Sequence, residues 1–378
     1  MATKNGKNGN GRILSDQSSM NSYIKSICDI MRRDKTKGAM QYIPELTWMM
    51  FLRILDEKEQ EEEMQCEAVG KSFSPSLKYP YRWRDWGSPK GKKRKEIQDK
   101  GKLGDFLDFV NQDLIPHIKS FEKAQNATIK QKIISQVFRK IEKTQLVSER
   151  NLLDALDKVD HLTSENIDST HQFPLSQIYE GLLLKLGEKK NDGGQFFTPR
   201  EVIRAMIRAI TPKLKVKGRD ATIYDPCCGT GGFLAETFAY LINQEPTATE
   251  IDYLKHNALW GLDDSDDAFP IALANLALHG IDFPHIGIKN TLSGRPTYIE
   301  LFQGAPSQFD YILTNPPFGG SEGEDAKTSF AYKTGSTQVL FLQHIIDKLK
   351  DGGTCAMVID EGVLFRTNAT SFVQTKRK

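Results

Sequence analysis

The second half of the chain alternates short apolar segments with longer amphipathic ones, and this alternation constrains the fold more than any other feature. Strict alternation of strand and helix is typical of a parallel sheet with helices on both faces. We therefore predict an α/β fold. The expected strands are residues 221–225, 259–262, 309–314 and 354–359, and the expected helices are residues 250–257, 266–279, 338–350 and a segment from 233 onward.

A glycine-rich loop follows the first expected strand, in ATIYDPCCGTGGFL. The strand ends at Asp225, and Gly229, Gly231 and Gly232 lead into a helix. Glycines let the backbone approach a ligand closely, and the N-terminus of the following helix is electropositive. The spacing differs from the G-x-G-x-x-G of dinucleotide folds, and Asp225 would repel a phosphate. We therefore predict a cationic ligand that carries an ammonium or sulfonium group.

Acidic residues end the next expected strand, in GLDDSDDAF. Asp263 stands where an acidic side chain can accept hydrogen bonds from both ribose hydroxyls of a nucleoside. Its distance along the chain from the glycine loop exceeds the roughly 20 residues of a dinucleotide fingerprint, which leaves room for the helix expected at 250–257. The alternative is an ordinary polar turn before a helix.

The third expected strand runs directly into two prolines, in FDYILTNPPFGG. Proline has no N–H for a sheet ladder and restricts the residue before it, so we expect Asn315 to be extended at the carboxyl end of the strand. Taken alone, Pro316 and Pro317 would only terminate the strand. However, Asp225, Asp263 and Asn315 all follow strands of one expected sheet, and open α/β sheets bind their ligands at that edge.

The first half of the chain has a helical pattern, from about residue 21 to residue 160. Apolar residues at i, i+3, i+4 and i+7 predict one buried stripe made of Trp48, Phe51, Leu52 and Leu55. We expect the acidic run at 56–63 to be a solvated helix end. A second helical segment places Leu175, Ile178, Leu182 and Leu186 along one face.

The segment YPYRWRDWGSPKGKKRK, residues 79–95, breaks the helical pattern and is typical of a loop that mixes aromatic and basic residues. We expect Trp83 and Trp86 to anchor this loop to its own domain. The basic cluster from Lys90 to Lys95 fits two interpretations equally well. It either contacts DNA phosphates or is merely solvated.

Length, charge and cysteine content limit the classes to which this protein can belong. The chain has 378 residues, enough for two domains, and 51 basic against 49 acidic residues, so any basic surface must be local. No apolar run has the length of a membrane span and the start lacks the apolar core of a signal peptide, so we expect a cytoplasmic protein with a flexible N-terminal tail. The five cysteines have no metal-ligand spacing, and we expect reduced thiols and no metal.

Three motifs carry a resemblance to a known family. QFFTP, DPCCGTGGF and TNPPF, in this order, resemble the cofactor and catalytic motifs of adenine DNA methyltransferases of the gamma arrangement, which use S-adenosylmethionine. The leader SICDIMRRDKTKGAMQYIPELTWMMFLRIL and the run IYEGLLLKLGEKKNDGGQFFTP narrow the resemblance to the modification (M) subunit of type I restriction-modification systems.

The resemblance implies a Rossmann-like methyltransferase sheet, here lacking its last strands, with an all-helical N-terminal domain. The implied domains are a tail at 1–20, the helical domain at 21–165 and the methyltransferase domain at 166–378. The implied activity is methyl transfer from S-adenosylmethionine to the exocyclic amine of adenine in DNA. The implied partners are double-stranded DNA, a specificity (S) subunit, a second M subunit and a restriction (R) subunit, with no membrane.

The resemblance also implies roles for individual residues. Asn315, Pro316, Pro317 and Phe318 would form the catalytic pocket. The implied cofactor contacts are Gln195, Phe196, Phe197, Thr198, Pro199, Asp225, Pro226, Gly229, Thr230, Gly231, Gly232, Asp263, Asn290, Thr291 and Leu292.

The chemistry of an aromatic amine agrees with the Asn-Pro-Pro-Phe turn. The Asn315 amide oxygen and the Pro316 carbonyl can each accept one amine N–H, which draws the nitrogen towards tetrahedral geometry and aims its lone pair. Phe318 offers a face for a base flipped out of the duplex. Two alternatives remain open: a methylase that acts on RNA or protein amines, and an inactive S-adenosylmethionine-binding scaffold.

Overall fold

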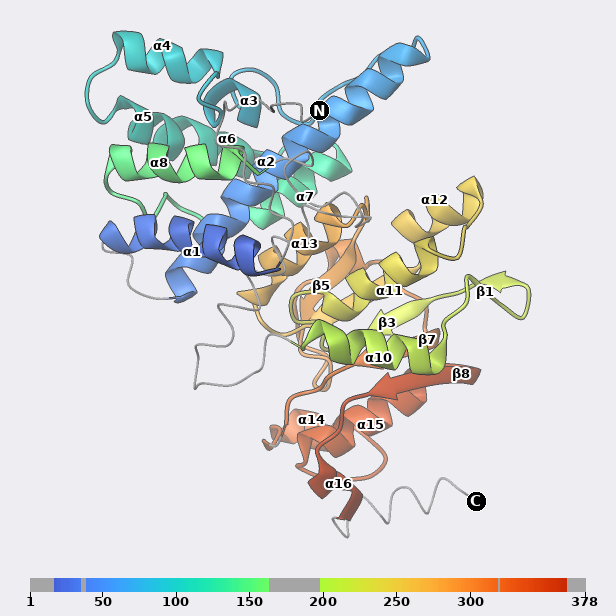
Figure 1. The fold of residues 1–378 in the computed structure, drawn as a ribbon. Coiled ribbons are helices and arrows are strands. Elements are labelled where there is room, and N and C mark those ends of the chain that lie inside the picture. Colours follow the sequence, from blue (N-terminus) through green and yellow to red (C-terminus); the bar gives the residue numbers. More distant parts are fainter. Residues whose placement is uncertain (1–16, 35–38, 163–197, 319, 366–378) are drawn as a thin grey trace, which may run out of the picture. The chain divides into compact units, whose positions relative to one another are not determined.

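The structure is a computed structural model, and it describes residues 17–34, 39–162, 198–318 and 320–365. These residues form two compact units (Figure 1). A helical unit holds the described residues up to 116 together with 142–162, and an α/β unit holds 117–141 and the described residues from 198 onward. The helical unit is therefore interrupted in sequence. The expected domain boundary near 165 and the predicted helix with Leu175 to Leu186 lie outside the described residues.

The helical unit is built around a long helix. Its helices are α1 (Gln17–Arg33), α2 (Ala39–Ala68), α3 (Trp83–Trp86), α4 (Lys92–Lys100), α5 (Asp105–Asp108), the π-helical η1 (Phe109–Leu114) and α8 (Glu149–Asp160), while α6 (Ile115–Ser120) crosses into the second unit. The predicted stripe on α2 is buried, and so are Met49, Met50 and Ile54 on its other sides. Packing thus surrounds the middle of α2. Since α1 begins at Gln17, the last residues of the expected N-terminal tail are helical.

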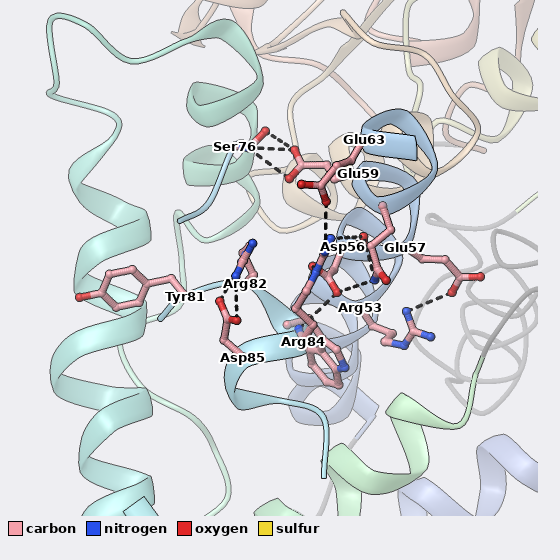
Figure 2. A network of polar contacts seen from close by, with 12 residues as sticks. Arg53, Asp56, Glu57, Glu59, Glu63, Ser76, Tyr81, Arg82, Arg84 and Asp85 are labelled. Carbon is pink, nitrogen blue, oxygen red and sulfur yellow. Dashed lines mark hydrogen bonds and ion pairs between the residues drawn. The ribbon is translucent and has the colours of Figure 1, made fainter. Parts of the chain in front are cut away.

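The acidic run on α2 is solvated only in part, so this prediction was partly wrong: Glu61 and Glu62 are exposed, but the helix continues to Ala68. Asp56 and Glu59 are buried. Figure 2 shows why: the segment that follows α2 folds back, Arg84 Nε lies 2.8 Å from Asp56 Oδ1, and the Ser76 N–H donates to Glu59 Oε1 at 3.1 Å. Arg84 also reaches Glu63 through Nη1 at 3.2 Å. Buried carboxylates of this kind need such partners, because desolvation otherwise penalises their charge.

The aromatic segment that follows is partly helical rather than a loop. Trp83 and Trp86 are buried, as predicted, and the Trp86 ring lies 6.3 Å from the Trp48 ring of α2. The basic cluster is divided between the core and the surface. Arg94 is buried, where its Nη1 lies 2.6 Å from Asp157 Oδ1 and donates to the Gly87 carbonyl. The lysines at 90, 92 and 95 are exposed.

The α/β unit contains a six-stranded sheet in the order β6-β5-β4-β3-β7-β8. All neighbours pair in parallel except the edge strand β6, which is antiparallel to β5. The strands are β3 (Ile223–Asp225), β4 (Leu259–Asp263), β5 (His285–Lys289), β6 (Pro296–Tyr298), β7 (Phe309–Thr314) and β8 (Leu349–Met357), and β1 (Lys215–Val216) and β2 (Arg219–Asp220) form a separate hairpin. The expected sheet is confirmed for four strands, whereas β5 and the antiparallel β6 were not predicted.

Helices cover both faces of the sheet, as predicted. Ile345 of α15 packs with Tyr224 and Ile312 on one face. On the other face, a Cβ added to Gly261 of β4 would lie 2.9 Å from Leu234 of α11, so β4 and α11 are in close contact there. The helices are α7 (Ile129–Val137), α10 (Arg200–Ile210), α11 (Gly232–Ile242), α12 (Ala248–His256), α13 (Ala268–Leu278), η3 (Glu300–Phe302), α14 (Glu324–Ser329), α15 (Thr337–Lys348) and α16 (Glu361–Phe365). Within the described ranges, no helix combines the length and apolar character that crossing a bilayer requires.

Candidate active site

Three polar side chains meet at one edge of the sheet. β3 lies between β4 and β7, and all three strands are parallel. Asp225 ends β3, Asp263 ends β4 and Asn315 directly follows β7. Their carboxyl ends therefore lie side by side, which confirms the predicted arrangement and places these residues where α/β sheets bind ligands.

Asp225 is a buried carboxylate with one unused oxygen. Its side chain is 1% exposed. Oδ1 accepts hydrogen bonds from Thr314 Oγ1 at 2.7 Å and from the Cys227 N–H at 3.2 Å, whereas Oδ2 is buried and has no hydrogen-bond partner among the described residues. Burial raises the pKa of Asp225 to about 7, and the negative charge of Asp263 adds to the rise. A cation beside Oδ2 would offset both effects.

The glycine loop is held in place by hydrogen bonds from its backbone N–H groups to β4. The Cys228 N–H donates to the Leu262 carbonyl at 2.8 Å, and the Gly229 N–H donates to Asp263 Oδ2 at 2.8 Å. Gly231 has φ of 77°, a region that favours glycine. At Gly232 an added Cβ would lie 2.2 Å from Arg200 Nη1, so only glycine fits without displacing that buried side chain.

Asp263 has a structural task beside its predicted one. Oδ2 accepts from Gly229, and Oδ1 accepts from the Ser265 N–H at 2.9 Å. Burial raises the pKa of Asp263. The polar-turn interpretation is therefore correct in part, because Asp263 organises the turn before α13. Each oxygen of an ionised carboxylate can accept a second hydrogen bond, so the predicted ribose contact remains chemically open.

Asn290, Thr291 and Leu292 follow β5 at the same edge. Asn290 Oδ1 accepts from the backbone N–H groups of Leu292 and Ser293, at 3.1 and 2.7 Å. Thr291 Oγ1 donates to the Pro226 carbonyl at 2.6 Å. Leu292 is buried in a cluster with Leu340 and Phe341. This segment thus braces the glycine loop, and its contact with a cofactor adenine stays a prediction.

The Asn-Pro-Pro-Phe turn presents one acceptor and one aromatic ring. Asn315 Nδ2 donates to Thr198 Oγ1 at 3.1 Å, while Oδ1 is buried and accepts no hydrogen bond from any described residue. Pro316 is buried. Phe318 is 58% exposed, which leaves its ring open to a partner such as a base. Pro199 is the N-cap of α10, next to Thr198, whereas Gln195, Phe196 and Phe197 lie outside the described residues.

Three site residues were missed from the sequence. Thr314 bonds Asp225, Arg200 lies against Gly232, and Asn275 Nδ2 donates to the Thr230 carbonyl at 2.8 Å. Asn275 is fully buried on α13. A single asparagine inside the apolar helix AFPIALANLAL was the available signal, because a buried amide needs a polar partner.

The sheet is of the α/β methyltransferase type, with a glycine loop after β3, an acidic residue at the end of β4 and an Asn-Pro-Pro turn after β7. The family is more specific than this class. The chain belongs to the family described as N-6 DNA Methylase, which matches residues 170–376. Residues 20–171 match the HsdM N-terminal domain.

Relatives and solved structures agree with this family. The chain is 33% identical over 356 residues to the type I restriction enzyme EcoEI methylase subunit of Escherichia coli, covering 92% of this chain. A structure from Vibrio vulnificus YJ016, described as a modification subunit of a type I restriction enzyme, has 30% identity, a TM-score of 0.76 and covers 96% of this chain and 75% of its own. A structure of a type I R-M system has 32% identity, a TM-score of 0.71 and covers 96% of this chain and 68% of its own. The chain spans 66% of the EcoEI subunit and 58% of the EcoKI methylase subunit of E. coli K12.

Proposed function

We propose that this chain binds S-adenosylmethionine and transfers its methyl group to the exocyclic amine of adenine in double-stranded DNA, as the modification subunit of a type I restriction-modification system. One observation carries the proposal. Two buried acceptors, Asp225 Oδ2 and Asn315 Oδ1, have no partner among the described residues, and they stand at the carboxyl ends of the neighbouring strands β3 and β7. Unsatisfied buried acceptors are costly, so each is expected to meet a donor or a cation in the working enzyme.

The residues at this edge fit the proposed cofactor. Bound S-adenosylmethionine supplies a methyl group activated by a sulfonium. Asp225 would hold the charged amino acid end, with Gly231 and Gly232 allowing close approach, and Asp263 would hold the ribose. Asn290, Thr291 and Leu292 would lie by the adenine. A cationic ligand suits the buried carboxylate of Asp225 and the partly buried one of Asp263 better than a phosphate does.

The turn after β7 fits the proposed target. The exocyclic amine of adenine is a weak nucleophile, because its lone pair is delocalised into the ring. Asn315 Oδ1 and the Pro316 carbonyl would each accept one N–H and localise that lone pair on the nitrogen. Phe318 would stack on the flipped base. No strong general base is required, since the product proton can leave to water.

The proposed partners come from the relatives. The similar chains are named as methylase subunits of type I restriction enzymes, which supports a complex with a specificity subunit, a second modification subunit and a restriction subunit. The family description favours adenine in DNA over the alternatives of RNA or protein amines. We propose that the exposed lysines at 90, 92 and 95 add contacts with DNA phosphates, without sequence preference.

The test uses the chain co-purified with the specificity subunit of its own system. Unmodified DNA is incubated with S-adenosylmethionine labelled in the methyl group, and the DNA is digested to nucleosides. The proposal predicts label in N6-methyladenine alone. Label in cytosine or in protein, or an unlabelled adenine fraction despite cofactor binding, would contradict it.

A further inference from the structure

We infer that Thr198 is a positioning residue: its hydroxyl holds the Asn315 amide so that Oδ1, and not the NH₂ group, faces the target amine. The inference rests on the proposed function, because it assigns the means by which the proposed catalytic asparagine is oriented. It also gives Thr198 a task other than the cofactor contact expected from the sequence.

The side-chain amide of asparagine needs such an orientation. Its oxygen and nitrogen ends have nearly the same shape, but only the oxygen accepts a hydrogen bond. An amide turned by half a rotation would present two N–H donors to an amine that itself donates. This mismatch would remove the hydrogen bond that localises the amine lone pair.

In the structure, the nitrogen end of the amide is the one that is bonded. Asn315 Nδ2 donates to Thr198 Oγ1 at 3.1 Å, and this leaves Oδ1 without a partner among the described residues. The neighbouring hydroxyl of Thr314 is not available, because it donates to Asp225 Oδ1 at 2.7 Å and also lies 3.0 Å from Cys227 Sγ. Thr198 is therefore the described residue whose hydrogen bond to Nδ2 holds the amide with Oδ1 free.

Helix α10 fixes Thr198 relative to the glycine loop. Pro199 caps α10, and Arg200 in its first turn lies against Gly232. One turn later, Arg204 makes a bidentate ion pair with Glu236 of α11, at 2.8 and 2.9 Å. Glu236 is buried, which favours a fixed geometry. Helix α10 therefore packs beside the glycine loop. Thr198, two residues before the first residue of α10, is held there with it.

Loss of the Thr198 hydroxyl should slow the methyl-transfer step and leave cofactor binding nearly unchanged. Thr198→Val keeps the size and branching of the side chain but cannot accept a hydrogen bond. The amide would then rotate, and the productive orientation would be populated for part of the time only. We expect kcat to fall by about tenfold to a hundredfold, as for other losses of alignment. The KM for S-adenosylmethionine should stay within about twofold, since binding precedes the contact with the amine.

The experiment compares Thr198→Val with Thr198→Ser in the complex with the specificity subunit. Serine keeps the acceptor, so Thr198→Ser should recover most of the wild-type kcat. A matched control is Thr237→Val on α11, where the buried Thr237 hydroxyl has no partner among the described residues. This control should leave kcat unchanged, and the melting temperature of each variant shows whether it folds.

The outcomes separate the inference from the proposed function. A slow Thr198→Val with a normal melting temperature, together with recovery by Thr198→Ser, is the expected result. Wild-type kcat in Thr198→Val, or equal losses in the valine and serine variants, would overturn the positioning role while the methyltransferase assignment stands. A wild-type complex that leaves adenine unmethylated would overturn both.

Discussion

The carboxylate of Asp225 is buried, lacks a partner for Oδ2 among the described residues and has a pKa raised to about 7. Since a cation binds the ionised form, affinity for S-adenosylmethionine should depend on pH. With a pKa near 7, binding at pH 6 should be about tenfold weaker than at pH 8, because a proton must leave before the cation binds. Calorimetry at the two values in buffers of different ionisation enthalpy measures the affinity and the released proton. Equal affinity at both would contradict the contact.

The same pKa has a consequence for stability, with a definite sign. Because the folded pKa of Asp225 lies above its ordinary value, the native state holds the extra proton between about pH 4 and 7. This contribution to the free energy of unfolding is present at low pH and is lost as the pH rises through 7. Asp225→Asn removes the titration, so the affinity and this part of the stability should both become independent of pH in that variant.

Asp263 has an observed task in the loop and a proposed contact with the ribose, and two variants test the proposed contact. Asp263→Ala should weaken S-adenosylmethionine binding by about 1–3 kcal/mol, the range for one or two missing hydrogen bonds to a charged group. Asp263→Asn keeps one acceptor oxygen and should lose less. Calorimetric titration of both variants gives the values. Unchanged affinity in Asp263→Ala would remove this residue from the cofactor site and leave it only its bonds within the loop, such as the one to Gly229.

Phe318 is 58% exposed, whereas Pro316 in the same turn is buried. If the Phe318 ring stacks on the flipped base, Phe318→Ala should weaken binding of the target adenine by about 1–3 kcal/mol. Phe318→Trp should recover part of the loss, since indole also stacks. The KM for DNA and the single-turnover rate report the change. Wild-type values in Phe318→Ala would show that the exposed ring does not touch the base.

At the scale of elements, the segment from 76 to 100 was predicted least well from sequence. Its arginines form ion pairs with carboxylates from distant positions, such as Arg84 with Asp56 and Arg94 with Asp157. No local pattern encodes such pairs. The periodicity of α2 predicts its buried stripe but not the segment that folds over its acidic end. Burial of Trp83 and Trp86 was predictable, because large aromatic residues usually anchor the loops that hold them.

Arg94 of the basic segment is buried, but three of its lysines are exposed and can be tested for DNA binding. The lysines at 90, 92 and 95 are exposed and form no ion pair within the described residues. Changing all three to Gln should lower the salt dependence of DNA binding by about one unit of slope for each phosphate that a lysine no longer neutralises. Binding should weaken to a similar degree on every duplex sequence. Gel-shift titrations at several salt concentrations measure both effects.

A matched control uses three other exposed lysines, Lys123, Lys132 and Lys143. The same Gln changes there remove the same total charge. If both triple variants lose the same affinity, the segment at 90–95 has no particular contact with DNA. If only the first loses affinity, the lysine cluster is a DNA-binding surface.

The strands of the sheet differ in how strongly their own sequences predict them. β7 was predicted residue for residue, because a segment rich in strand-forming residues that ends at two prolines is a strong signal. β5 was missed, since Ile286 and Ile288 are the only large apolar residues in HIGIK. β6 is a short edge strand with an exposed proline, so its pairing depends on β5 rather than on its own sequence.

At the scale of the whole molecule, the sheet places residues far apart in sequence at one edge. Its strand-end positions were predictable from the order of strands and helices, because parallel topology brings carboxyl ends together. The hydrogen bonds between them were not. Thr198 and Asn315 are 117 residues apart, and Asp225 and Thr314 are 89 apart. Only the packed structure reveals which acceptors are already satisfied and that Asp225 Oδ2 and Asn315 Oδ1 remain open among the described residues.

Asn315→Ala removes the buried acceptor on which the proposed methyl transfer depends. If Asn315 Oδ1 accepts a hydrogen bond from the target amine, the contact matters chiefly in the transition state. In the complex with the specificity subunit, Asn315→Ala should bind S-adenosylmethionine with nearly wild-type affinity and transfer no measurable methyl group to adenine. Asn315→Asp, which keeps an acceptor, should retain part of the activity. Wild-type turnover in Asn315→Ala would contradict the account and reduce the Asn-Pro-Pro-Phe turn to the terminator of a strand.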